Sequence, residues 1–188
     1  WVLEELKKYH AKATFFCIGN NIKKHPGLFR RIIAEGHSAG NHTFDHLNGW
    51  KTNTEEYIDN VLNAEEEIMK WSKVESPMSE DEINPNSPIS DQPSTLSNLF
   101  RPPYGKLSSR QSQILRQKGY NIIMWDVLSG DFDASISEEN CFNNVSECIK
   151  PRSIVVFHDS LKARKKLRYV LPKVLELISE KGWNCEKI

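Results

Sequence analysis

Hydrophobic positions along the chain follow two alternating patterns, one with a helical period and one of short continuous apolar runs. The run 13–19, Ala-Thr-Phe-Phe-Cys-Ile-Gly, is typical of a strand buried on both faces, whereas 26–36 carries apolar residues three and four positions apart, as on one face of a helix. The predicted helices are 2–8, 26–36, 52–71, 108–119, 137–148 and a last one around 171–178. The predicted strands are 13–19, 37–41, a short one that begins at 99, 120–125, 153–157 and 183–188.

Residues with special backbone preferences mark the ends of several helices. Pro26 suits the first turn of a helix, and Thr52 with Glu55 three residues later predicts a capping box. Gly36 and Gly119 follow the last apolar residues of their helices, where glycine readily adopts a left-handed conformation. These signals support the helix boundaries drawn from the hydrophobic period.

Six strands that alternate with helices predict an α/β fold with a parallel sheet and helices outside it, either an open doubly wound sheet or a barrel. A chain of 188 residues accommodates one such domain, 1–188. Within it, the stretch 76–98 is rich in Ser, Pro, Asn, Asp and Glu and predicts a mobile polar insert. No glycine-rich phosphate loop is present, so nucleotide binding is not indicated.

Composition narrows the possible partners. The 25 basic and 25 acidic side chains cancel, so no basic surplus favours nucleic acid or an anionic membrane, and no apolar run has the length of a membrane span. The four cysteines contain no Cys-x-x-Cys pair, so a zinc knuckle is not supported. The chain opens on Trp1 directly in an apolar segment, and we expect it to be a piece of a longer protein. Compartment and oligomeric state stay open.

Candidate chemistry begins at Asn-His-Thr-Phe-Asp-His, residues 41–46. His42 and His46 are four residues apart, so on a helical turn or at the exit from a strand both imidazoles can face one divalent ion. Surface or hydrogen-bonded histidines are the alternative explanation of the pair alone. Polar residues also follow several other predicted strands, at the rim where α/β folds place their sites. The residues in these positions are His42, His46, Arg101, Tyr104, Asp131 and His158.

Four segments carry a family resemblance in their order along the chain. They are His-Thr-Phe-Asp-His at 42–46, Arg-Pro-Pro-Tyr at 101–104, Asp-Phe at 131–132 and Val-Val-Phe-His-Asp at 155–159. Together they resemble the second to fifth motifs of the polysaccharide deacetylase family, which shares the NodB-like domain and is also called carbohydrate esterase family four. The resemblance implies a distorted (β/α) barrel of about seven strands, with the first strand apparently missing from this chain. It also implies metal-dependent hydrolysis that removes acetyl groups from an N-acetylated sugar polymer.

The resemblance assigns a metal centre to the first of these segments. His42 and His46 would be ligands, and Thr43 would brace the ligand loop. Neutral imidazoles suit one divalent ion, zinc first, with cobalt or nickel as alternatives. Asp45 is expected to be a hydrogen-bonding partner or a solvated side chain and not a ligand.

Catalytic roles follow from the resemblance in the same way. Arg101 would orient a catalytic carboxylate, and the backbone N–H of Tyr104 would face the tetrahedral oxyanion. His158 would be the general acid, held and charge-stabilised by Asp131.

Alternatives remain for the partner of His158 and for the residues that line the acetyl pocket. The match around Asp131 is looser, because the family commonly has Trp where Phe132 stands, so Asp126 or Asp133 could be the partner of His158. Trp125 and Val155 would line a pocket for the acetyl methyl group, or they belong to the core.

One family motif has no counterpart. The first, Thr-Phe-Asp-Asp-Gly, supplies the general base and a third metal ligand, and it does not occur in residues 1–188. We expect it upstream of Trp1. Two other functions stay open: a catalytically dead carbohydrate-binding protein on the same fold, and a hydrolase of small amides.

Overall fold

The computed structural model describes residues 1–72 and 96–188, so residues 76–95 of the predicted polar insert lie outside the described residues. The chain folds into two compact units. We call Thr14–Ile123 the central unit, and Trp1–Ala13 together with Met124–Ile188 the terminal unit. Each is described by itself, and a single domain over 1–188 stays a prediction.

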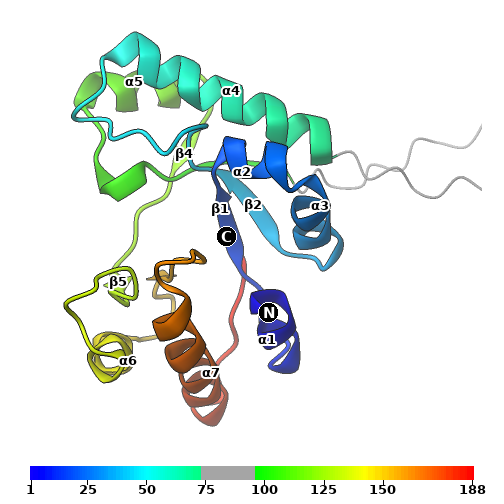
Figure 1. Cartoon of the computed structure of the whole chain (residues 1–188), viewed down its shortest axis with the longest axis vertical. Coiled ribbons are helices and arrows are strands. Elements are labelled where there is room, and N and C mark those ends of the chain that lie inside the picture. The colour runs from blue at the N-terminus through cyan, green and yellow to red at the C-terminus, as the bar shows by residue number, and fades with distance from the viewer. Residues whose placement is uncertain (73–95) are drawn as a thin grey trace, which may run out of the picture. The chain divides into compact units, whose positions relative to one another are not determined.

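A parallel sheet organises the central unit. Its strands are β1 (Thr14–Cys17), β2 (Ser38–Asn41), β3 (Leu96–Phe100) and β4 (Asn121–Ile122), side by side in that order. The helices are α2 (Gly19–Lys24), α3 (Pro26–Ala34), α4 (Thr54–Ser72) and α5 (Ser109–Gln117), with a single 3₁₀ turn at Pro103–Gly105 (Figure 1). Because neighbouring parallel strands need a crossover between them, these helices supply the connections. β3 begins at Leu96, inside the stretch 76–98 that the composition assigned to the insert.

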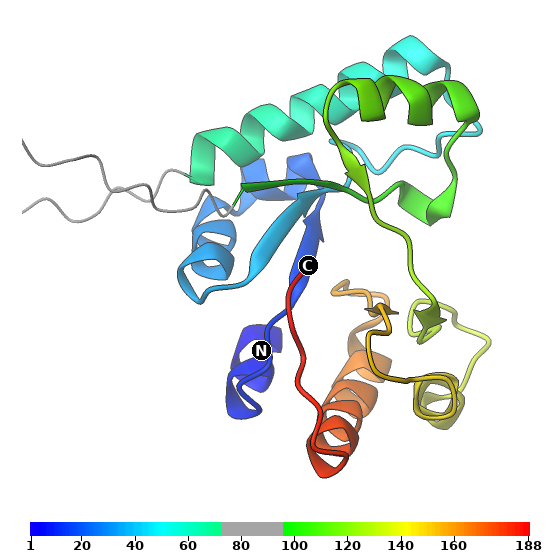
Figure 2. The ribbon, with the colours of Figure 1, turned by 180° about the vertical axis from the view of Figure 1, so that it is seen from behind.

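The terminal unit has the same pairing on a smaller scale. Strands β5 (Val127–Leu128) and β6 (Val155–Val156) are parallel, and the helices are α1 (Val2–Lys8), α6 (Glu138–Ser146) and α7 (Arg164–Glu180). Helix α7 packs against both α1 and α6 (Figure 2). The predicted parallel α/β fold is therefore confirmed. The described residues form sheets of four and two strands, and a barrel of about seven strands is not seen.

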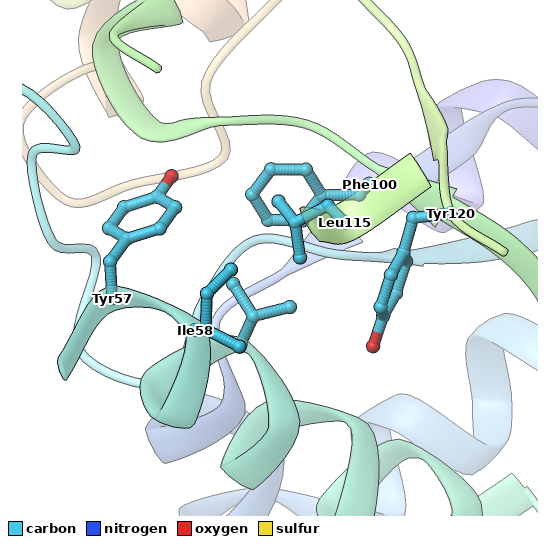
Figure 3. Packing of buried hydrophobic residues seen from close by; sticks show 6 residues of the cluster. Tyr57, Ile58, Phe100, Leu115 and Tyr120 are labelled. Carbon is cyan, nitrogen blue, oxygen red and sulfur yellow. The ribbon is translucent and has the colours of Figure 1, made fainter. Parts of the chain in front are cut away.

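Each unit has a hydrophobic core beside its strands. In the central unit, side chains from α4, β3 and α5 meet in one cluster (Figure 3). Its buried members are Tyr57, Ile58, Val61, Phe100, Leu115 and Tyr120. In the terminal unit, Val127 and the buried faces of α6 and α7 form a second cluster. No helix in the described ranges combines the length and apolar character needed to cross a membrane.

Several strand predictions were wrong in extent. The predicted strand 120–125 is a strand only at Asn121–Ile122, and 153–157 only at Val155–Val156. Residues 183–188 form no strand, although the Lys12 N–H donates to the Cys185 carbonyl at 2.9 Å. Conversely, β5 lies after the predicted strand 120–125, where no strand was predicted, and there Val127 is buried and pairs with Val155.

Local signals also misplaced parts of two helices. Helix α4 begins at Thr54, two residues after the predicted start at Thr52, and the capping side chain is that of Asn53, which accepts the bond from the Glu56 N–H. Helix α2 was missed because Gly19-Asn-Asn is a poor helix-forming start. A Cβ at Gly19 would lie 2.8 Å from the Cα of Ala64, so glycine is required where α2 approaches α4.

Leu115 provides a test of the central core. We expect Leu115→Ala to lower the free energy of unfolding by about 2–5 kcal/mol, because it empties space around a fully buried side chain. Leu161→Ala is the control, since Leu161 is 90% exposed and its loss should change stability by less than about 0.5 kcal/mol. Urea unfolding measures both. Equal effects of the two substitutions would contradict the packing described.

Candidate functional site

Residues 42–46, here called the histidine loop, leave the end of β2 and are held by backbone hydrogen bonds. The His42 N–H donates to the Cys17 carbonyl at 3.0 Å, and the Gly19 N–H donates to the Thr43 carbonyl at 3.0 Å. Thr43 and His46 have φ values of 61° and 60°, in the left-handed region that non-glycine residues rarely adopt. Such strain persists only where the surroundings determine the backbone, and it is concentrated at functional sites.

Two buried asparagines hold the backbone of the histidine loop in this conformation. Asn41 donates from Nδ2 to the Val61 carbonyl at 2.8 Å and accepts the Thr43 N–H at 2.9 Å. Asn60 on α4 accepts the N–H groups of residues 44 and 45 at 2.8 and 2.9 Å, and it donates to the Asp45 carboxylate at 2.8 Å. Of the two roles expected for Asp45, a hydrogen-bonding partner or a solvated side chain, the structure shows the first.

Neither asparagine is among the site residues predicted from the sequence. A usable signal was present for one of them, because Asn60 lies among Tyr57, Ile58 and Val61 on the buried side of α4. An amide on an otherwise apolar helix face must find hydrogen-bond partners, and here these partners are the histidine loop.

The two imidazoles lie together at the loop. Their ring centroids are 5.0 Å apart, with an angle of 64° between the ring planes. The Nδ1 atom of His42 lies 2.6 Å from the carbonyl oxygen of Arg101. A carbonyl only accepts, so Nδ1 carries the proton and the neutral ring has its lone pair on Nε2. His46 contacts Tyr104, with Nδ1 3.2 Å from the phenol oxygen.

These histidines fit part of a metal centre. A ligating histidine usually donates its second ring N–H to a carbonyl or carboxylate, which is what His42 does. Within residues 1–72 and 96–188, no group of three or more His, Cys, Asp or Glu side chains is arranged to hold a metal. His42 and His46 are therefore a partial donor set, and their role as ligands stays a prediction.

Arg101 joins β3 to the histidine loop. Its N–H donates to the Asn41 carbonyl at 3.0 Å, and its Nε donates to the Ile123 carbonyl at 3.2 Å. The guanidinium carbon lies 4.1 Å from the ring centroid of Phe16. Burial lowers the pKa of Arg101 to about 10, so the group is still charged at neutral pH, as its predicted role of orienting a carboxylate requires.

Tyr104 lies in a tight turn directly after Arg101. Its φ of 59° is left-handed, and the turn is closed by the Gly105 N–H bond to the Pro102 carbonyl at 3.0 Å. The side chain is 60% exposed and packs edge-on against His46, with ring centroids 4.7 Å apart. The central unit thus brings together His42, His46, Arg101 and Tyr104.

The terminal unit holds the other predicted pair. The Asp131 carboxylate is buried and receives two hydrogen bonds from His158, one from the backbone N–H at 2.7 Å and one from Nδ1 at 2.8 Å. The ring of Phe132 packs edge-on against the imidazole at 4.7 Å. One carboxylate therefore fixes both the backbone and the ring of His158, which is about one-third exposed.

The two alternative partners of His158 are engaged elsewhere. Asp126 accepts the Ile154 N–H at 2.6 Å, and Asp133 accepts the N–H and the hydroxyl of Ser135. These backbone hydrogen bonds lower the pKa of each carboxyl, which keeps both ionised. Geometry therefore favours Asp131 over either alternative.

The two residues predicted to line an acetyl pocket are both half-buried. Val155 packs against the cluster formed by α6 and α7, which is the core alternative that the sequence left open. Trp125 comes just before β5. A role of Trp125 and Val155 in binding the acetyl group stays a prediction.

Comparison with known proteins gives this arrangement a context. The family model described as polysaccharide deacetylase matches residues 2–80. A peptidoglycan-N-acetylglucosamine deacetylase of Bacillus cereus is 28% identical over 97% of this chain and 76% of its own length. A chitooligosaccharide deacetylase of Azorhizobium caulinodans is 30% identical over 84% of this chain and 65% of its own.

A solved structure agrees over the whole chain. A peptidoglycan N-acetylglucosamine deacetylase bound to a hydroxamate-type benzamide superposes with a TM-score of 0.81 and 26% identity, covering 100% of this chain and 78% of that one. The fold is therefore the α/β fold of the carbohydrate esterase family four deacetylases. The resemblance read from the four motifs is confirmed, because the chain is similar to polysaccharide deacetylases in both sequence and fold.

Asn60 allows a test of how the histidine loop is held. We expect Asn60→Ala to weaken binding of Zn²⁺ or Co²⁺ about 10- to 100-fold, because residues supporting a ligand loop act on affinity at this scale. Asn63→Ala is the matched control, since Asn63 is exposed on the same helix. Calorimetric titration with each ion measures the affinity. Equal affinities of the two variants would contradict the role given to Asn60.

Proposed function

We propose that this chain carries out metal-dependent hydrolysis of N-acetyl groups on an N-acetylated polysaccharide or oligosaccharide of the chitin or peptidoglycan type. The observation that carries the proposal is the paired imidazoles of His42 and His46, with Nδ1 of His42 bound to the Arg101 carbonyl. The relatives named above are deacetylases of such sugars, which supports the same substrate class. From the same resemblance we propose a complete fold of about seven strands in a distorted (β/α) barrel.

In this proposal His42 and His46 hold one divalent ion, with zinc preferred for two imidazole donors and cobalt or nickel as alternatives. When bound, such an ion supplies Lewis acidity, polarising the amide carbonyl and making water more acidic. Tyr104 contributes its backbone N–H to the oxyanion that develops on the former carbonyl oxygen. Arg101 orients the carboxylate that takes the proton from water. In the family this carboxylate belongs to the first motif, which does not occur in residues 1–188.

His158 completes the reaction by protonating the departing amine. Its Nδ1 is bound to Asp131, so Nε2 is the atom that carries the mobile proton. As the amide C–N bond breaks, that proton passes to nitrogen, and the acetyl carbon keeps the oxygen gained from water as acetate. Asp131 maintains the ring orientation and stabilises the imidazolium form that donates.

One observation favours a second candidate function, carbohydrate binding without catalysis. Over the described ranges, the donors near the site amount to two histidines, fewer than the three protein ligands usual in catalytic zinc sites. This alternative keeps the fold and the sugar partner but predicts no acetate release.

His42 provides the test of metal-dependent deacetylation. With N-acetylglucosamine oligomers as substrate, we expect chelation to abolish acetate release and added Zn²⁺ to restore it, because the ion supplies the Lewis acidity. His42→Ala should lose both bound metal and activity, whereas His25→Ala should keep them, since His25 is exposed at the start of α3. Full activity of His42→Ala without metal would refute the proposal. Oligomer binding without acetate release would favour the second candidate.

The role of Asp131 has its own test. We expect Asp131→Asn to lower kcat about 100-fold or more, because the imidazole loses the carboxylate that orients it. Asp126→Asn and Asp133→Asn are the matched controls, since both carboxylates bond to other groups. Steady-state acetate release measures all three. A larger loss in either control would move the role to that residue.

A further inference from the structure

Trp50 is an exposed aromatic side chain in the loop that follows the histidine loop. It is 66% exposed. Exposure alone does not indicate a function, because isolated exposed hydrophobic residues are common on protein surfaces. What distinguishes Trp50 is that it is held in place. Its Nε1–H donates to the Leu107 carbonyl at 3.2 Å, and its backbone N–H donates to Oδ1 of Asn48 at 3.0 Å. The ammonium group of Lys106 lies 3.9 Å from the ring centroid.

The backbone beside Trp50 is equally constrained. A Cβ at Gly49 would lie 2.5 Å from the Lys106 carbonyl and 2.7 Å from Oε1 of Gln111, so only glycine fits this close approach. Gln111 is buried and donates from Nε2 to the Gly49 carbonyl at 2.9 Å. The segments around 49 and 106 are thus packed backbone to backbone, and the indole is fixed to both.

These same two segments carry part of the candidate site. Trp50 follows His46 by four residues, so their Cα atoms are at most about 14 Å apart. Its hydrogen-bond partner Leu107 follows Tyr104 by three residues, and Tyr104 contacts His46 directly. A chain of a few sugar units that places one acetyl group at His46 can therefore extend to the indole.

We propose that Trp50 is a stacking platform for a sugar ring of the acetylated polymer, in a subsite next to the unit that is deacetylated. This inference rests on the proposed function. A sugar ring presents an apolar C–H face, and a flat aromatic surface matches it in shape and polarity. Because the indole is already held by Leu107 and Lys106, little side-chain freedom is lost on binding. Such a platform favours long substrates over short ones.

The test compares a disaccharide with a hexasaccharide of N-acetylglucosamine. We expect Trp50→Ala to reduce the KM advantage of the hexasaccharide about three- to tenfold, the scale of one aromatic contact, and Trp50→Phe to retain part of that advantage. Trp71→Ala is the matched control. Its indole also donates from Nε1 and lies near a lysine, but it is about 25 Å along α4 from the start of that helix.

Binding gives a readout independent of catalysis. Titration of the hexasaccharide should change the tryptophan fluorescence of the wild type and of Trp71→Ala, and this change should be absent in Trp50→Ala. Unaltered length dependence and fluorescence in Trp50→Ala would overturn the stacking platform while leaving the proposed function intact. Failure of the wild type to release acetate would overturn the proposed function, and the fluorescence titration would still decide whether Trp50 contacts sugar.

Discussion

The histidine loop depends on hydrogen bonds from two side-chain amides. Asn41 fixes the start of the loop, and Asn60 accepts two successive backbone N–H groups while also bonding to Asp45. Each of these N–H groups would cost about 1–3 kcal/mol if it were buried without a partner. The strained backbone at Thr43 and His46 is tolerated because these hydrogen bonds hold it in place. The backbone in turn sets the positions of the two imidazoles.

The sequence allowed the fold class to be predicted because its signals are local, whereas most candidate site residues were assigned by the family resemblance. Buried apolar runs identified the parallel strands, and the four-residue spacing of His42 and His46 identified the loop. Strand ends were less predictable, because an apolar residue such as Ile123 gives the same sequence signal whether or not it is hydrogen-bonded to a neighbouring strand. The short strand β5 was missed for a related reason, since it forms only where a distant segment pairs with it.

The roles of other site residues could be recognised only in the three-dimensional structure. The family resemblance favoured Asp131 but left Asp126 and Asp133 open, and the hydrogen-bond partners distinguish the one that faces His158. Asn60 lies 15 residues from Asp45, so its role in the loop has no local spacing to reveal it. Candidate catalytic residues can be recognised by their side-chain type, whereas residues that hold the backbone are recognised by their hydrogen-bond partners in the structure.

Arg101 contributes to the site through its backbone as well as its side chain. Its carbonyl orients His42 and its N–H is bound to Asn41, and neither contact depends on which side chain position 101 carries. Mutational drift at this position would therefore remove the guanidinium while leaving the imidazole arrangement intact. The proposed hydrolysis could therefore be lost by a change at position 101 that leaves the backbone of the histidine loop in place.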